Sequence, residues 1–322
     1  MVKKSVFAEH YRPKKLDEVI GQDHVIFWLK KFVKNKHIPH MMFSGPAGVG
    51  KTTVSIALAR ELYGDGWEKY FLEMNASDER KIDDVRTKVK GYAQVKVIDR
   101  DFKIIFMDEC DSVTPPAQAA LRRIIEKNST RCRFILSCNF PNRIIEPIID
   151  RCVVFRFRAI SPQNMKFLLK KIAQKEDIDI TDSAIMTLAT LTNGSMRRAL
   201  GILETLKFSG ITNINDDTIY NVTCYVNDEF IMNLLKSVAK GDLDLVDKRI
   251  DDLLDVKTYQ PSEILESLYR LIKDSKKLPI EAKLQALTKA GDVEFRLSMG
   301  SVPKFQLKTF MAYLMSLYKK HE

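Results

Sequence analysis

Short apolar runs alternate with longer amphipathic stretches between about residue 38 and residue 158. Strands that are apolar throughout are typical of a parallel sheet covered by helices on both faces. The alternation therefore predicts an α/β domain over residues 1–160, built on a five-stranded parallel sheet. The predicted strands are residues 40–44, 70–74, 103–108, 133–138 and 153–157.

Past residue 160 the strand pattern stops, and helical spacing of the apolar positions replaces it. Ser161-Pro162 is typical of a helix start, with serine as the N-cap and proline at the first helical position. Two further helices are predicted at 181–192 and 195–208, on either side of the break at Asn193-Gly194. We predict a small helical lid domain over residues 161–226.

From residue 228 to the end, the pattern predicts four or five more amphipathic helices. Apolar residues recur at helical spacing, and prolines at 261, 279 and 303 mark helix starts or ends. No candidate chemistry falls in this part of the sequence. We predict an all-α domain over residues 227–322 that serves oligomerisation by holding neighbouring subunits.

A glycine-rich loop follows the first predicted strand. Residues 45–53 read GPAGVGKTT, an intact Walker A motif between a strand and a helix. Its glycines let backbone amides turn toward phosphate oxygens, helped by the positive end of the helix dipole. We expect Lys51 to reach the β- and γ-phosphates and the Thr52 hydroxyl to take one Mg²⁺ position. An unused glycine loop is the alternative. The residues expected around the phosphates are Gly45, Pro46, Ala47, Gly48, Val49, Gly50, Lys51, Thr52 and Thr53.

Two further strands end in polar side chains that suit nucleotide hydrolysis. Strand 103–108 runs into Asp108-Glu109, a Walker B arrangement in which Asp108 orients the Mg²⁺ ligands and Glu109 polarises the attacking water as general base. Asn139 follows strand 133–138 and places a neutral amide where it can position water beside the γ-phosphate. Taken alone, acids after a strand also serve as helix caps and asparagine also forms turns.

Composition excludes several classes of protein. The 322 residues are 45% hydrophobic and 29% charged, which is ordinary for a globular chain. No apolar run approaches the roughly 20 residues that cross a bilayer, and residues 1–5 lack the apolar core of a signal peptide, so we expect an intracellular protein. The five cysteines form no CxxC pair, which favours free buried thiols over a zinc or redox site.

The net charge of +10 is unevenly distributed. Residues 1–200 carry 35 Lys and Arg against 24 Asp and Glu, whereas residues 201–322 carry 17 against 18. A basic front part beside a neutral remainder is consistent with a polyanionic partner, although basic proteins without one are common.

The motifs together resemble the small subunits of archaeal and eukaryotic replication factor C, a clamp-loader family of AAA+ ATPases. The resemblance runs from residue 7 to about residue 205. It implies an AAA+ P-loop domain, a helical lid and a C-terminal collar domain. The segments that carry it are HYRPKKLDEVIGQDHV (10–25), PHMMFSGPAGVGKTT (39–53), LEMNASDERKIDDVR (72–86), FMDECDSVTPPAQAALRRIIE (106–126), FILSCNF (134–140), IIEPIIDRC (144–152) and NGSMRRAL (193–200).

The resemblance assigns further roles in binding the nucleotide. Arg197 in GSMRR corresponds to the lid arginine that contacts the γ-phosphate in cis, while Ser195 also fits a helix N-cap. Where many relatives have DEAD this chain has DECD, which keeps both acids, so we expect hydrolysis to survive. The family's contacts to the adenine base correspond to Tyr11, Arg12, Val19 and Ile20, although Val19 and Ile20 are also compatible with simple core positions.

Other implied roles reach outside the nucleotide pocket. Arg151 corresponds to the arginine finger that enters the neighbouring subunit's ATP site, and Asp150 replaces the family's serine beside it, where an acid can pair with the finger. Arg80 and Arg86 match contacts to the phosphate backbone of the template strand, with a solvated charged helix face as the alternative. Lys81 stands where relatives usually have glycine.

These expectations define a function. We expect ATP-dependent loading of a sliding clamp onto primer-template DNA, with ATP and Mg²⁺ as cofactors and with a large subunit and further small subunits as partners. No membrane partner is expected, and the location follows the source: the nucleoid-associated cytoplasm of an archaeon or the nucleus of a eukaryote. Two alternatives stay open, another DNA-associated AAA+ motor such as a Holliday-junction helicase, and a non-hydrolysing scaffold subunit.

Overall fold

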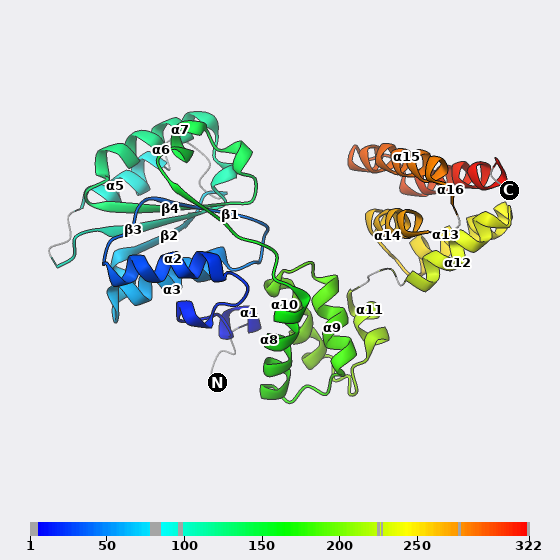
Figure 1. Ribbon diagram of the computed structural model, residues 1–322, viewed down its shortest axis with the longest axis horizontal. Coiled ribbons are helices and arrows are strands. Elements are labelled where there is room, and N and C mark those ends of the chain that lie inside the picture. The colour runs from blue at the N-terminus through cyan, green and yellow to red at the C-terminus, as the bar shows by residue number, and fades with distance from the viewer. Residues whose placement is uncertain are drawn as a thin grey trace. The chain divides into compact units, whose positions relative to one another are not determined.

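The computed structural model describes residues 6–77, 85–95, 99–223, 226, 228–275 and 278–320, without the side chains of residues 85 and 86. The chain divides into two compact units, Met1–Ile214 and Asn215–Glu322. The helices and strands of both units are labelled in Figure 1. The predicted boundaries at residues 160 and 226 stay predictions.

The first unit is built on a five-stranded sheet in the order β2-β3-β4-β1-β5, with all neighbouring strands parallel. The predicted parallel sheet is confirmed, with each strand end within one residue of its expected position. Because β1 lies between β4 and β5, the loop that follows it opens beside the ends of these two strands. The strands are β1 (Met41–Ser44), β2 (Phe71–Asn75), β3 (Lys103–Asp108), β4 (Cys132–Cys138) and β5 (Val153–Arg156).

Two cores sandwich this sheet. Ile104 and Phe106 of β3 belong to the core under α2 and α3, while Ile105 and Met107 belong to the core under α6. Alternate residues of one strand thus enter opposite cores, which explains why the run is apolar throughout. The helices of these layers (Figure 1) are α2 (Asp23–Lys34) and α3 (Lys51–Tyr63) on one face, and α5 (Lys90–Gln94), α6 (Pro115–Asn128) and α7 (Glu146–Ile149) on the other.

Short single turns complete this part of the unit. They are α1 (Phe7–His10), η1 (Leu16–Glu18), η2 (Trp67–Tyr70), η3 (Val85–Val89), η4 (Cys110–Ser112) and η5 (Pro141–Arg143). Four of them are 3₁₀ turns, which commonly connect longer elements, while α1 is a single α-helical turn and η3 is a π-helical turn.

The remaining helices of the first unit are α8 (Pro162–Lys175), α9 (Asp182–Leu191) and α10 (Met196–Phe208). Their starts are fixed by side-chain caps. Ser161 accepts from the Asn164 amide at 3.3 Å, and Thr181 and Ser195 cap α9 and α10 in the same way. α1 packs on α10, so the start of the chain joins this helical part.

Among the described residues of the second unit, all regular elements are helices. Its core is a cluster of aliphatic and aromatic side chains from α12 to α16. Proline occupies the first turn of α14 and of α16 and directly precedes α15, as expected for helix starts. The helices are α11 (Asp216–Thr223), α12 (Asp228–Ala239), α13 (Leu243–Asp251), η6 (Asp252–Val256), α14 (Pro261–Asp274), α15 (Ile280–Ser298) and α16 (Pro303–Lys320).

Two negative findings hold for the part of the chain that the structure describes. None of its helices combines the length and the apolar character needed to cross a bilayer, and no cluster of three metal-ligating side chains occurs. The described cysteines are free, and Cys110, Cys132 and Cys138 are buried. Cys224 lies outside the described residues.

Candidate functional site

The loop between β1 and α3 forms the floor of a pocket in the first unit, and its glycines allow close packing. A Cβ on Gly45 would lie 2.4 Å from the Phe157 carbonyl oxygen. A Cβ on Gly48 would lie 2.1 Å from the Ser195 hydroxyl, and the Gly48 backbone has a φ of 77°. Larger residues would push the loop away from these neighbours, so the glycines are required by space as well as by conformation.

Lys51 is held inside this loop. Its Nζ donates to the carbonyl oxygens of Gly45 at 2.5 Å and Pro46 at 2.8 Å, and to Asn139 Oδ1 at 2.9 Å. The residue is only 7% exposed, and burial lowers the pKa of its amine, with Asp108 opposing that shift. The structure therefore brings together the lysine and the asparagine that the sequence placed after two different strands.

Thr52 and Asp108 also meet, because the Thr52 hydroxyl donates to Asp108 Oδ2 at 2.8 Å. Glu109 follows with a left-handed backbone at φ 54°, an unusual conformation for a residue other than glycine and one found often at active sites. Its side chain is exposed, lines the pocket and makes no capping hydrogen bond to η4. The helix-cap interpretation of this acid therefore fails.

Asp111 is a site residue that the sequence interpretation missed. Its two carboxylate oxygens accept from the backbone amides of Asn139 at 3.3 Å and Phe140 at 3.1 Å. These bonds fix the turn after β4 and with it the direction of the Asn139 side chain. In the sequence, Asp111 could have been found as the second aspartate of the DECD segment.

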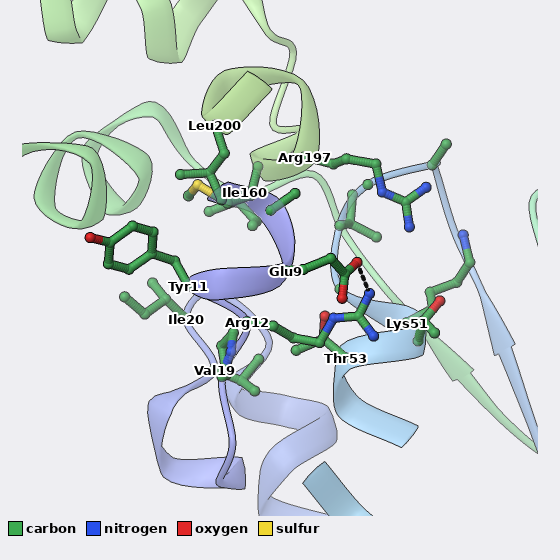
Figure 2. Close-up of a pocket in the computed structure, with 18 of the residues that line it drawn as sticks. Glu9, Tyr11, Arg12, Val19, Ile20, Lys51, Thr53, Ile160, Arg197 and Leu200 are labelled. Carbon is green, nitrogen blue, oxygen red and sulfur yellow. Dashed lines mark hydrogen bonds and ion pairs between the residues drawn. The ribbon is translucent and has the colours of Figure 1, made fainter. Parts of the chain in front are cut away.

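The opposite end of the pocket is apolar (Figure 2). Val19 and Ile20 are half-buried and line it, and their contact to an adenine base stays a prediction. Sequence reasoning did not include the apolar residues that complete this end, because they come from the lid helices and from the segment that leads from β5 to them. They are Ile160, Leu168, Met196 and Leu200.

Tyr11 and Arg12 extend in different directions. Figure 2 shows Tyr11 at the apolar end, whereas the Arg12 side chain extends toward Lys51 and pairs with Glu9. The Tyr11 hydroxyl donates to Glu176, and burial together with this bond raises the pKa of Tyr11 to about 12. Tyr11 therefore keeps its proton at neutral pH and ties the start of the chain to the end of α8.

The lid closes over the loop through backbone bonds. The Met196 amide donates to the Gly48 carbonyl at 3.1 Å, and the Ile160 amide donates to the Gly194 carbonyl at 3.3 Å. Arg197, in the first turn of α10, lines the pocket, and Figure 2 shows its side chain on the Lys51 side. The N-cap role of Ser195 and a pocket position for Arg197 therefore hold together.

Gln22 is a second residue that sequence reasoning missed. Its side chain is fully buried at 0% exposure. Its Nε2 donates to the carbonyl oxygens of Arg158 at 2.8 Å and Val49 at 3.4 Å, and its Oε1 accepts from the Arg158 amide at 3.2 Å. One amide thus joins the phosphate loop to the segment that leads from β5 to the lid.

Arg151 does not line this pocket. Its guanidinium donates to the Pro147 carbonyl at 2.6 Å and pairs with Glu126 at 2.6 Å, while its side chain remains 34% exposed. The acid that pairs with Arg151 is therefore Glu126 of α6, not the adjacent Asp150 that the sequence suggested.

The two proposed DNA contacts are not tested by the structure. Arg80 lies outside the described residues, and Arg86 is described only through its backbone in η3. Their role stays a prediction.

Comparisons with protein families match three parts of the chain. The family described as ATPase family associated with various cellular activities (AAA) matches residues 41–159. The replication factor C C-terminal domain matches residues 226–313, and the Holliday junction DNA helicase RuvB P-loop domain matches residues 11–69.

Curated relatives align with the chain over nearly its whole length. The replication factor C small subunit of Archaeoglobus fulgidus is 44% identical over 318 residues, covering 98% of each chain. The protein of the same name from Methanosarcina barkeri is 40% identical and covers 97% of this chain and 96% of its own.

Among solved structures, the Thermotoga maritima RuvB Holliday junction branch migration motor is similar, with a TM-score of 0.56 and 20% identity. The alignment covers 81% of this chain and 91% of that one. At this identity the likeness shows a shared fold.

Proposed function

The chain belongs to the replication factor C small-subunit family, and on that premise we propose that it is an ATP-hydrolysing subunit of a clamp loader. In this proposal it binds ATP with Mg²⁺ in the pocket of the first unit and uses hydrolysis to load a sliding clamp onto primed DNA. Its partners are a large subunit, further small subunits and the clamp, and its place is at replicating DNA in the cytoplasm.

The pocket suits a nucleoside triphosphate at both ends. The apolar end between Val19, Ile20 and the lid fits a flat base, and the loop at residues 45–53 presents backbone amides to phosphates at the start of α3. Lys51 already donates to three oxygens that belong to the protein. Phosphate oxygens of the ligand would replace some of these acceptors, because charged oxygens bind an ammonium more strongly.

The pair of Thr52 and Asp108 fits a magnesium ion. A hydroxyl and a carboxylate that lie 2.8 Å apart beside the lysine would supply two of the oxygen ligands that Mg²⁺ prefers. When bound, the ion neutralises charge on the phosphates as the γ-phosphate leaves.

Glu109 and Asn139 are the residues that we assign to the attacking water. The exposed Glu109 carboxylate is the general base, and the Asn139 amide orients the water without adding charge. Asp111 holds the Asn139 backbone in place, and Arg197 reaches the γ-phosphate from the lid.

The observation that carries the proposal is the separation of Arg151 from an otherwise complete site. Arg151 extends from the turn before β5 and takes no part in lining the pocket. An arginine finger is worth on the order of 10³- to 10⁵-fold in rate in other NTPases. We therefore propose that Arg151 enters the pocket of the adjoining subunit, so that an isolated subunit hydrolyses ATP slowly.

Both alternatives are weaker than this reading. A non-hydrolysing scaffold subunit normally has a broken Walker motif, whereas Lys51, Thr52 and Asp108 are intact and brought together here. A Holliday-junction motor would need a C-terminal winged-helix domain with a β-hairpin. From residue 228 onward the regular elements that the structure describes are all helices, and residues 226–313 match the replication factor C C-terminal domain.

The DNA contact is proposed from charge. The surplus of basic residues lies in residues 1–200, where Arg80 and Arg86 are the named candidates for phosphate contacts. Contacts of this kind release counterions, so we expect DNA binding to weaken steeply as salt concentration rises.

The test is the ATPase rate of the complex reconstituted with its large subunit, measured with and without sliding clamp and primed DNA. We expect the clamp and primed DNA together to raise the rate, with duplex DNA that lacks a primer end as the control. A Lys51→Ala complex should lack the activity. If clamp and primed DNA leave the rate unchanged, the clamp-loader assignment is wrong although the ATPase assignment survives.

A further inference from the structure

Arg151 is part of a three-residue cluster on the surface of the first unit. Glu126 Oε1 accepts from Arg122 Nε at 2.9 Å and pairs with the Arg151 guanidinium at 2.6 Å. Arg122 and Glu126 lie one helical turn apart on α6, while Arg151 comes from the turn after α7. A single carboxylate oxygen therefore lies between two arginines.

The cluster fixes the direction of Arg151. An unrestrained arginine has several rotatable bonds, and ordering its guanidinium opposes binding through lost entropy. Here the Glu126 carboxylate and the Pro147 carbonyl each take one donor group. A guanidinium has five N–H donors, so donors remain for phosphate oxygens of another subunit.

Glu126 is itself held in place and does not cancel the charge of the finger. Arg122 holds the carboxylate from its own helix, and the hydrogen bond from Arg122 lowers the pKa of Glu126, with Arg151 contributing further. Two arginines and one glutamate leave the cluster with a net positive charge. An anionic phosphate is therefore still attracted to it.

We propose that Glu126 is a positioning residue for Arg151, holding the guanidinium ready to enter the ATP site of the adjoining subunit. The proposal rests on the trans arginine role proposed above and adds to it the residue that orients the arginine. Because Glu126 belongs to the donor subunit and does not line the pocket that binds ATP, its loss should slow turnover without weakening nucleotide binding.

The experiment compares four variants in the complex reconstituted with the large subunit, at saturating clamp and primed DNA. Glu126→Gln removes the charge and keeps an acceptor oxygen, and Glu126→Ala removes both. Asp150→Asn is the matched control, since it removes an exposed negative charge next to Arg151 in the sequence. Arg151→Ala reports the full contribution of the finger.

We expect kcat to fall about tenfold in Glu126→Ala and less in Glu126→Gln, as for a displaced catalytic group, with KM for ATP within about twofold of wild type. Asp150→Asn should keep the wild-type kcat. Melting temperature and size-exclusion chromatography check folding and assembly; if the alanine variant does not assemble, the near-isosteric glutamine variant decides.

Three results would overturn the assignment of Glu126. These are a wild-type kcat in both Glu126 variants, a raised kcat, which would mean that Glu126 restrains the finger, or an equal loss in Asp150→Asn, which would mean a general charge effect. The trans role of Arg151 fails separately, if Arg151→Ala itself leaves the complex at full rate.

Discussion

Replacing Gln22 by glutamate tests how the phosphate loop is joined to the lid. The substitution keeps the shape of the side chain and the oxygen that accepts from the Arg158 amide. It replaces the NH₂ group that donates to the Arg158 and Val49 carbonyls by a second oxygen. The introduced carboxyl is fully buried and faces two carbonyl oxygens, so its ionised form is disfavoured there.

The loss of unfolding free energy in Gln22→Glu follows from the linkage between protonation of the introduced carboxyl and folding. Burial should raise the pKa of the introduced carboxyl in the folded chain well above its value of about 4.3 in the unfolded chain. Between these two pKa values the folded chain holds more protons, so stability relative to wild type falls as pH rises, by about 1.4 kcal/mol per pH unit. If the folded-state pKa exceeds 7, the deficit reaches about 3.7 kcal/mol at pH 7. Near pH 4 the protonated carboxyl can donate to one carbonyl, and the deficit should be small.

The assay is denaturant unfolding of variant and wild type from pH 4.5 to pH 8, read as the difference between the two, so that other titrating groups cancel. Gln22→Met is the control, because it removes the three hydrogen bonds without adding a titratable group and should lose stability equally at every pH. KM for ATP should rise with pH in Gln22→Glu, since Val49 belongs to the phosphate loop. A deficit that is absent, or that does not change with pH, would refute the reasoning.

Three further substitutions probe the same unit. Gly48→Ala puts a Cβ 2.1 Å from the Ser195 hydroxyl at a φ of 77°, so KM for ATP should rise at least about tenfold, measured by steady-state kinetics. Asp111→Asn leaves one of its two acceptors, so kcat should fall severalfold while calorimetry shows a nearly unchanged Tm. Burial, and after it the charge of Arg133, lowers the pKa of His40 to about 4, so the wild type should lose up to about 3 kcal/mol of unfolding free energy as pH falls from 6.5 to 4. His40→Gln has no group that titrates at this position, so its melting temperature should change less with pH in thermal melts.

The layered sheet could be predicted from the sequence because its cause is local. Strand β3 alternates between two buried cores, as Ile104 and Ile105 show, and that arrangement makes its run apolar. The Walker segments were predictable for a related reason. Parallel strands bring their ends to one edge, so Lys51, Asp108 and Asn139 had to approach each other.

The residues that were missed act through partners far away in the chain. Gln22 binds Arg158, and Asp111 binds the turn at Asn139. Their local sequence shows only a polar residue in a loop or turn, and nothing in it names the backbone group that it meets. The partner of Arg151 was unpredictable for the same reason, because the carboxylate that pairs with it belongs to Glu126, 25 positions away, and not to the adjacent residue.

Mixed complexes test whether Arg151 of one subunit completes the ATP site of another. One chain carries Lys51→Ala and the other Arg151→Ala, and each is assembled alone with the large subunit and also as an equal mixture. We expect little hydrolysis for either variant alone and a clear recovery in the mixture, where an intact pocket meets an intact arginine. A mixture that assembles fully and still hydrolyses no faster than the separate variants would contradict this role of Arg151.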